Sequence, residues 1–191
     1  MSDQKQIKPV VVAIISKRST DGFRIMTQKR RVRDLPYDPL YDNTWEAVGE
    51  TLLPNEDVMT AVVRGILEEC GMSVDPLWIF GNSDDLLAPL GDGNRFAMWT
   101  SGQGDQTILR RPFAFVQSIG EPQLWLGPVF LVSVPPSWEP NFGAADGEAT
   151  EHRWWKPEEL LEEMHSHPEE FMGLHAPALR LLAAGLTHQR G

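Results

Sequence analysis

The sequence predicts a single α/β domain in which a mixed β-sheet is packed between helices, an α+β sandwich. Three observations lead to this fold class: short β-branched apolar segments lie on both sides of one amphipathic helical segment, helical patterns end the chain, and no internal repeat or low-complexity linker divides it. We therefore expect one domain over residues 1–191, with about eight flexible residues at the N-terminus.

Two β-strands are predicted at the start of the chain. Residues 10–18 (VVVAIISKR) are apolar and β-branched, which is typical of a buried strand. The turn residues STDG follow, and residues 23–30 (FRIMTQKR) alternate as a second strand, so the two segments should form a β-hairpin. Residues 45–49 (WEAVG) are expected to form a short strand that ends at a glycine.

An amphipathic helix is predicted over residues 56–70. Asn55 is the expected N-cap, and the two acidic residues after it favour the positive end of the helix dipole. Apolar residues recur at helical spacing, and Gly71 stands where a left-handed residue ends a helix. Gly65 lies well inside this helix, where glycine costs about 1 kcal/mol relative to alanine.

The rest of the chain alternates strands and loops before it ends in helices. Strands are expected at residues 77–81, 95–100, 113–117, 123–135 and 152–155. Loops are expected at residues 83–94, 101–106 and 139–151. Helices or helical turns are expected at residues 157–167 and 168–186, each of which begins with a proline that suits a first helical turn.

Charge and cysteine content restrict the function classes. Acidic residues outnumber basic residues by 27 to 17, giving a formal net charge of −10, which argues against stable nucleic-acid binding through phosphate contacts. The single cysteine, Cys70, cannot form an intramolecular disulfide, which fits a reducing compartment. There is no signal-peptide pattern and no apolar run as long as a membrane span. We expect a cytoplasmic protein without membrane association.

Carboxylates gather along the predicted helix. Glu56 lies at its start, and Glu68 and Glu69 lie near its end, within the stretch RGILEECGM of residues 64–72. Carboxylate oxygens on one helix suit a hard divalent cation such as Mg²⁺, which also binds substrate phosphates. The simpler interpretation is that acidic residues on a helix are only solvated.

The spacing of these residues resembles the Nudix box of the Nudix hydrolase family, over residues 49–72. The family pattern is glycine, five residues, glutamate, seven residues, then R-E-U-x-E-E-x-G-U, where U is a bulky aliphatic residue. The matching residues are Gly49, Glu56, Arg64, Ile66, Glu68, Glu69, Gly71 and Met72. Two departures stand out: six residues separate Gly49 from Glu56, and Gly65 replaces the first glutamate of R-E-U-x-E-E.

The resemblance implies a Nudix-like fold and a role for each matching residue. Glu68 and Glu69 would coordinate Mg²⁺ or Mn²⁺, and Glu56 would support a second ion or its waters. Arg64 would orient a carboxylate through a salt bridge. Gly49 and Gly71 would be structural.

A later loop would supply the catalytic base that Gly65 does not. In the family such a residue often comes from a segment like ADGEATE, which makes Glu148 and Glu151 the candidates, with Asp146 and His152 as alternatives. Glu46 and Glu50 flank the first glycine of the motif and could also reach the cluster.

The function implied is metal-dependent hydrolysis of a phosphoanhydride in a nucleoside-diphosphate-linked compound, that is, a pyrophosphohydrolase of unspecified substrate. One alternative is a catalytically impaired Nudix-fold domain that binds a nucleotide or a protein, because Gly65 replaces a glutamate. Another is an α/β interaction domain with a fortuitous motif. Trp78, Trp99 or Trp138 could stack on a base or sugar. A homodimer is common in the resembled family.

Overall fold

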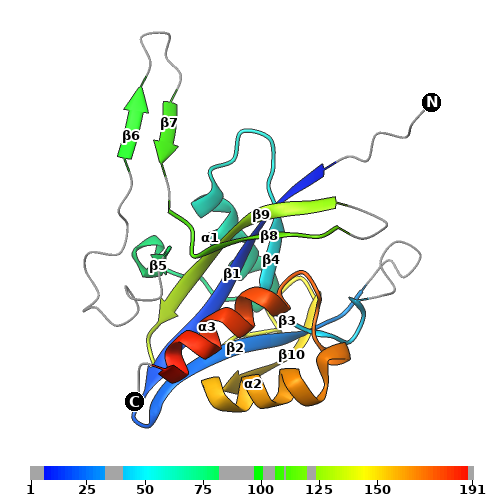
Figure 1. Cartoon of the computed structure of the whole chain (residues 1–191). Coiled ribbons are helices and arrows are strands. Elements are labelled where there is room, and N and C mark those ends of the chain that lie inside the picture. Colours follow the sequence, from blue (N-terminus) through cyan, green and yellow to red (C-terminus); the bar gives the residue numbers. More distant parts are fainter. Residues whose placement is uncertain are drawn as a thin grey trace, which may run out of the picture.

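The computed structural model describes residues 7–32, 41–81, 97–100, 106–109, 111–119 and 124–188 (Figure 1). An eight-stranded mixed sheet forms its centre. The strands of this sheet are β1 (Ile7–Ser19), β2 (Gly22–Arg30), β3 (Trp45–Glu46), β4 (Val48–Thr51), β5 (Ile79–Phe80), β8 (Ala114–Gln117), β9 (Leu124–Val134) and β10 (Ala149–Trp155). A separate two-stranded sheet joins β6 (Ala97–Thr100) to β7 (Gln106–Leu109). The helices are α1 (Val58–Cys70), α2 (Pro157–Ser166) and α3 (Ala176–His188), with the 3-10 turns η2 (Pro76–Trp78) and η4 (Pro168–Glu170).

Strand β1 organises the central sheet. It pairs antiparallel with β2 and β4 and parallel with β9, and the main strand order is β10-β2-β1-β9-β5. The β1–β2 hairpin and the mixed sheet expected from the sequence are both confirmed. A parallel neighbour needs a long crossover, and here that crossover carries α1 between β4 and β9.

Alternate residues of β1 point into two different cores. Val10, Val12 and Ile14 belong to the core under α2 and α3. Val11 and its alternate neighbours belong to the core under α1. Because helices cover both faces of the sheet, β1 reads as a continuous apolar run rather than as an alternating strand (Figure 1). The predicted α+β sandwich is confirmed.

Several boundaries differ from the sequence-based expectations. Residues 45–49 form two strands rather than one, because β3 pairs with β2 whereas β4 pairs with β1. The segment 168–186, expected as helix or helical turns, forms the 3-10 turn η4 and then α3 from Ala176, because Phe171 bridges to Trp45 between them. Strand β7 was not predicted and begins at the end of the expected loop 101–106. The expected loop 83–94 and the first six residues lie outside the described residues.

Helix α1 begins later than the sequence indicates. Asp57, not Asn55, is its N-cap, and the Asp57 carboxylate accepts a hydrogen bond of 3.2 Å from the backbone N–H of Met59. Asn55 has a φ of 64°, a left-handed conformation that an N-cap does not adopt. Asn and Asp rank alike as caps, so the residue types could not decide between them. Gly71, with a φ of 64°, ends the helix as expected.

Candidate functional site

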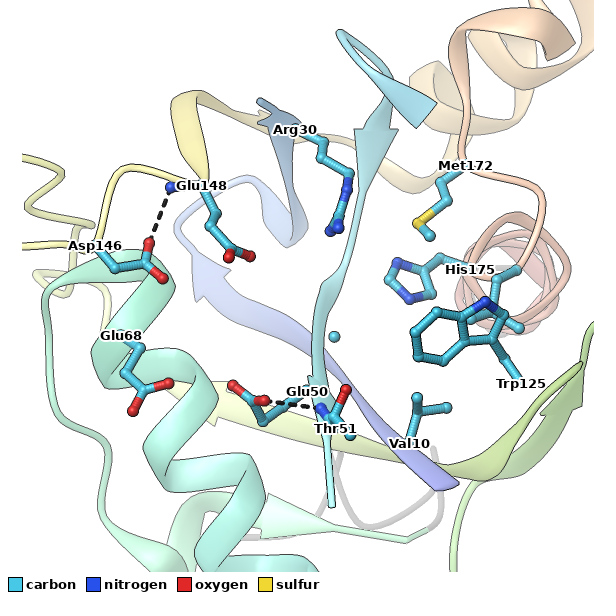
Figure 2. Close-up of a pocket in the computed structure, with 12 residues that line it drawn as sticks. Val10, Arg30, Glu50, Thr51, Glu68, Trp125, Asp146, Glu148, Met172 and His175 are labelled. Atoms are coloured by element: carbon cyan, nitrogen blue, oxygen red, sulfur yellow. Dashed lines mark hydrogen bonds between the residues drawn. The ribbon is translucent and has the colours of Figure 1, made fainter. Parts of the chain in front are cut away.

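A cavity of about 270 Å³ opens where β1, β4 and α1 meet the segments before β10 and α3 (Figure 2). Its lining residues are Val10, Arg30, Gly49, Glu50, Thr51, Glu68, Trp125, Asp146, Glu148, Met172, Leu174 and His175. They come from segments far apart in the chain, so the cavity exists only in the folded protein.

The cavity has an acidic side and an apolar side. In Figure 2 the carboxylates of Glu50, Glu68, Asp146 and Glu148 lie on one side, and Trp125 faces them from the other. Val10 and Met172 lie on the side of Trp125 in Figure 2, and Leu174 also lines the cavity. Such a cavity suits a ligand with a charged part and a flat apolar part.

The loop before β10 brings Asp146 and Glu148 to the end of α1. The last carbonyls of a helix have no partner within the helix, and this loop satisfies one of them with a hydrogen bond of 2.7 Å from Asp146 N–H to the Glu68 carbonyl. The Asp146 carboxylate in turn accepts a 2.9 Å hydrogen bond from the Glu148 N–H. This backbone pairing places the two loop carboxylates beside Glu68.

Arg64 of α1 is the centre of a network of carboxylates from β4, the loop before α1 and α1 itself. It binds both oxygens of Glu56, with Nε to Oε1 at 2.8 Å and Nη2 to Oε2 at 2.9 Å. Its Nη1 lies 3.0 Å from Glu50 Oε2 and 3.3 Å from Glu68 Oε2. Hydrogen bonds from Arg64 lower the pKa of Glu56 to about 2. Both Glu56 oxygens are therefore engaged, and Glu56 does not line the cavity.

Gly65 lies on the side of α1 that faces β4. A Cβ atom placed on Gly65 would lie 2.9 Å from the Cβ of Glu50, closer than real Cβ atoms come. Gly49 has a similar role on β4, because a Cβ there would lie 2.8 Å from the ring of His175. Glycine at both positions leaves room for a neighbouring side chain, and it is not there to provide an unusual backbone angle.

Glu69 is directed away from water. It is 2% exposed, and its Oε2 accepts a hydrogen bond from the side-chain amide of Gln28. Burial raises the pKa of Glu69 well above its usual range, and the neighbouring Glu46 raises it further. Its other oxygen, Oε1, has no hydrogen-bond partner among the described residues.

Two more buried titratable groups lie at the cavity: His175, which lines it, and Glu46, which is close to His175 and does not line it. Burial raises the pKa of Glu46 to about 7, although Arg30, 3.4 Å away, opposes this. Burial lowers the pKa of His175 to about 3. Its Nδ1 lies 3.9 Å from Glu46, too far for a hydrogen bond, so the two groups do not form a strong ion pair.

The structure brings together only some of the residues singled out in the sequence. Glu68 and Glu148 line the cavity, whereas Glu69 is buried and does not line it, and Glu56 is bound to Arg64. Glu151 is exposed on β10 and does not line the cavity. The alternative His152 contacts Glu139 instead.

Among the cavity residues that were not singled out in the sequence are one basic, one aromatic and one imidazole side chain: Arg30, Trp125 and His175. They lie on β2, on β9 and just before α3, with no motif spacing to mark them. Of the tryptophans named as stacking candidates, Trp78 and Trp138 pack with the core under α1, and the side chain of Trp99 lies outside the described residues.

The donor atoms around the cavity can be compared with the ligands that a divalent cation prefers. As the side chains stand, no three His, Cys, Asp or Glu residues of the described chain are close enough together to hold an ion. The donor chemistry nevertheless fits, because carboxylates line one side of the cavity and Glu69 Oε1 is buried without a partner. The Glu68 side chain is 46% exposed, so its carboxylate can change rotamer readily.

The fold and the helix–loop arrangement define a member of the NUDIX domain family. The family model matches residues 7–174, so the chain belongs to this family. A comparison with curated protein sequences gave no match. No helix of the described residues is long and apolar enough to cross a membrane.

Several solved structures share this fold at low sequence identity. A MutT NUDIX hydrolase from Burkholderia pseudomallei is 20% identical, with a TM-score of 0.55 over 92% of this chain and 97% of that one. A C. elegans Ap4A hydrolase in a binary complex is 10% identical, with a TM-score of 0.53 over 96% and 97% of the two chains. A bifunctional NMN adenylyltransferase/ADP ribose pyrophosphatase from Francisella tularensis, complexed with AMP and a Mn ion, is 15% identical, with a TM-score of 0.54 over 97% of this chain and 43% of that one.

Proposed function

We propose that this protein is a metal-dependent hydrolase that cleaves a phosphoanhydride in a nucleoside-diphosphate-linked compound. The observation that carries the proposal is the two-sided cavity, in which the carboxylates at the end of α1 face Trp125. The neighbours that act on Ap4A or ADP-ribose support this substrate class.

The charge of the site supports dependence on a cation. Carboxylates on one side of the cavity, in a protein of net charge −10, would repel a diphosphate. Glu68 and Glu69 would hold Mg²⁺ or Mn²⁺, which supplies neutralisation of the phosphate oxygens and a lower pKa for the attacking water. Glu56 holds Arg64 in place, so we assign it to positioning rather than to the ion.

Other residues that line the cavity would bind the substrate and accept a proton. The Arg30 guanidinium enters the cavity, where it can bind a phosphate oxygen (Figure 2). The Trp125 ring offers a face for a nucleobase. Glu148 is the cavity-lining residue that we assign as the acceptor of the proton from water.

The first test is hydrolysis of a panel of nucleotide sugars, dinucleoside polyphosphates, ADP-ribose and nucleoside triphosphates, with Mg²⁺, with Mn²⁺ and with EDTA. We expect cleavage of at least one compound, with nucleoside monophosphate among the products and none in EDTA. Loss of a general base typically lowers the rate about 10²–10⁴-fold, which is the effect expected for Glu148→Gln. The same change at the exposed Glu151 should have little effect and so separates the two candidates for the base.

A catalytically impaired nucleotide-binding domain is the second candidate, favoured by Gly65 at a position where the family carries glutamate. It predicts binding of a panel compound, measured by calorimetry, without turnover under any metal condition. This outcome would replace the hydrolase proposal.

A further inference from the structure

Glu50 and Gly65 occupy one shared volume. A Cβ on Gly65 would lie 2.9 Å from Glu50 Cβ, 3.4 Å from its Cγ and 3.5 Å from its Oε2. The tightest contact is with the atom next to the backbone, which cannot swing aside as a side-chain end can. Glu50 is also held by the β1–β4 ladder, where it pairs with Val11. A side chain at position 65 would therefore have to displace Glu50.

The Glu50 carboxylate is held in place at the acidic side of the cavity. Its Oε2 lies 3.0 Å from Arg64 Nη1, and its Oε1 accepts a 2.8 Å hydrogen bond from the Thr51 N–H. Figure 2 shows this carboxylate on the same side of the cavity as Glu68. Two donors restrict its rotamer, so little entropy is lost when it binds a ligand.

We propose that Glu50 supplies to the site, from β4, the carboxylate that residue 65 does not carry, and that position 65 is glycine in order to admit it. The inference rests on the proposed function. The glycine that weakens α1 is then a requirement of the site, because any larger residue would push Glu50 out of the cavity.

The first experiment measures hydrolysis of the best panel substrate and the affinity for Mn²⁺, the latter from the electron paramagnetic resonance signal of the free ion. Glu50→Gln keeps the size of the side chain and should lower both kcat and Mn²⁺ affinity about tenfold or more. Glu50→Asp should recover part of each loss. The matched control is Glu162→Gln, an exposed acid on α2 outside the cavity, which should change neither.

The second experiment tests the shared volume directly. Gly65→Ala should lower the Tm of the wild type, because its Cβ meets Glu50 Cβ, but raise the Tm of Glu50→Gly, where residue 50 has no Cβ and only the gain in helix propensity at position 65 remains. Gly65→Glu alone should lower the Tm and fail to raise activity. Combining it with Glu50→Gly, which removes the Cβ of residue 50, should recover Tm and a large part of kcat, since the carboxylate then reaches the cavity from α1.

Several results would overturn the role of Glu50. One is a Glu50→Gln variant whose kcat and Mn²⁺ affinity stay within twofold of the wild type. Another is a wild type that does not bind Mn²⁺. A third is a Gly65→Glu variant that is more active than the wild type and no less stable. If the wild type hydrolyses nothing in the panel, the proposed hydrolase function fails, while Mn²⁺ affinity and the Tm cycle still decide whether Glu50 belongs to the site.

Discussion

At the residue scale, the wall of the cavity depends on groups that burial keeps from ionising. His175 is 2% exposed, packs against Gly49 and has a pKa lowered to about 3 by burial. Glu46 beside it has a pKa raised to about 7 for the same reason. The two pKa shifts change the free energy of unfolding with pH in opposite directions. As the pH falls, the shift at His175 lowers the free energy of unfolding, because the folded state disfavours the charged imidazole, whereas the shift at Glu46 raises it, because the folded state favours the neutral acid.

The pH dependence of stability should reveal the buried imidazole. The unfolded chain binds a proton at His175 below pH 6.5 and the folded chain does not until about pH 3. The stabilisation is therefore complete above pH 6.5 and is lost as the pH falls. Relative to His175→Gln, the wild type should lose about 2 kcal/mol of unfolding free energy between pH 7 and pH 5, measured by urea denaturation.

Two features keep this measurement specific to His175. The contribution of Glu46 to the free energy of unfolding rises as the pH falls through 7. Glu46 is present in both proteins, so this contribution cancels when their free energies of unfolding are subtracted. The control is His165→Gln, where the ring is exposed on α2. A difference between wild type and His175→Gln that stays constant from pH 7 to pH 5 would contradict the assignment.

At the element scale, α1 carries most of the motif. The residue at which α1 starts determines which side chains of the preceding loop can reach the helix. The Asp57 carboxylate binds the Met59 N–H and so starts the helix at Val58. The loop can then place Glu56 beside Arg64, eight residues further along the chain, where both Glu56 oxygens are bound. The position of the cap thus explains why Glu56 is removed from the cavity.

Removal of this cap should destabilise the protein. Asp57→Ala takes away the acceptor for an otherwise unpaired N–H and should cost about 1 kcal/mol of unfolding free energy, read from the urea midpoint at constant m-value. Asp57→Asn is the matched control, because its side-chain oxygen can accept the same bond. Equal stability of the Ala and Asn variants would show that this cap does not limit the stability of α1.

The motif spacing predicted part of this element well. The positions of Glu68 and Glu69 follow from the local repeat of a helix, so the sequence could place them at the end of α1. Their different surroundings could not be predicted. Glu69 meets Gln28 on β2, a residue 41 positions away, whereas Glu68 faces the loop before β10.

At the scale of the whole molecule, the acidic balance and the cavity act together. The net charge of −10 favours cations in general, while the cavity concentrates carboxylates at one place. A cation that binds only the folded state stabilises it by mass action, whereas general screening depends on ionic strength alone.

Mn²⁺ should therefore raise the Tm beyond the effect of NaCl at equal ionic strength. At about 100 times the dissociation constant the stabilisation is roughly 2.7 kcal/mol, which for a chain of this size corresponds to a rise of about 5–10 °C. Differential scanning fluorimetry over a Mn²⁺ series measures it, and Glu68→Gln should reduce the rise. A Tm that follows ionic strength alone would argue against a built cation site.

The sequence by itself determined the strands β1, β2 and β9, the helix α1 and the helical spacing of the motif carboxylates. These features depend on local periodicity, which can be read without knowing what the segment packs against. Only the tertiary structure decided that Glu50 lies against Gly65, that Arg64 binds Glu56, and that Trp125 faces Glu68 and Glu148. Those contacts join separate segments through the pairing of β1 with β4 and β9, and no local pattern specifies which strands become neighbours or in which register.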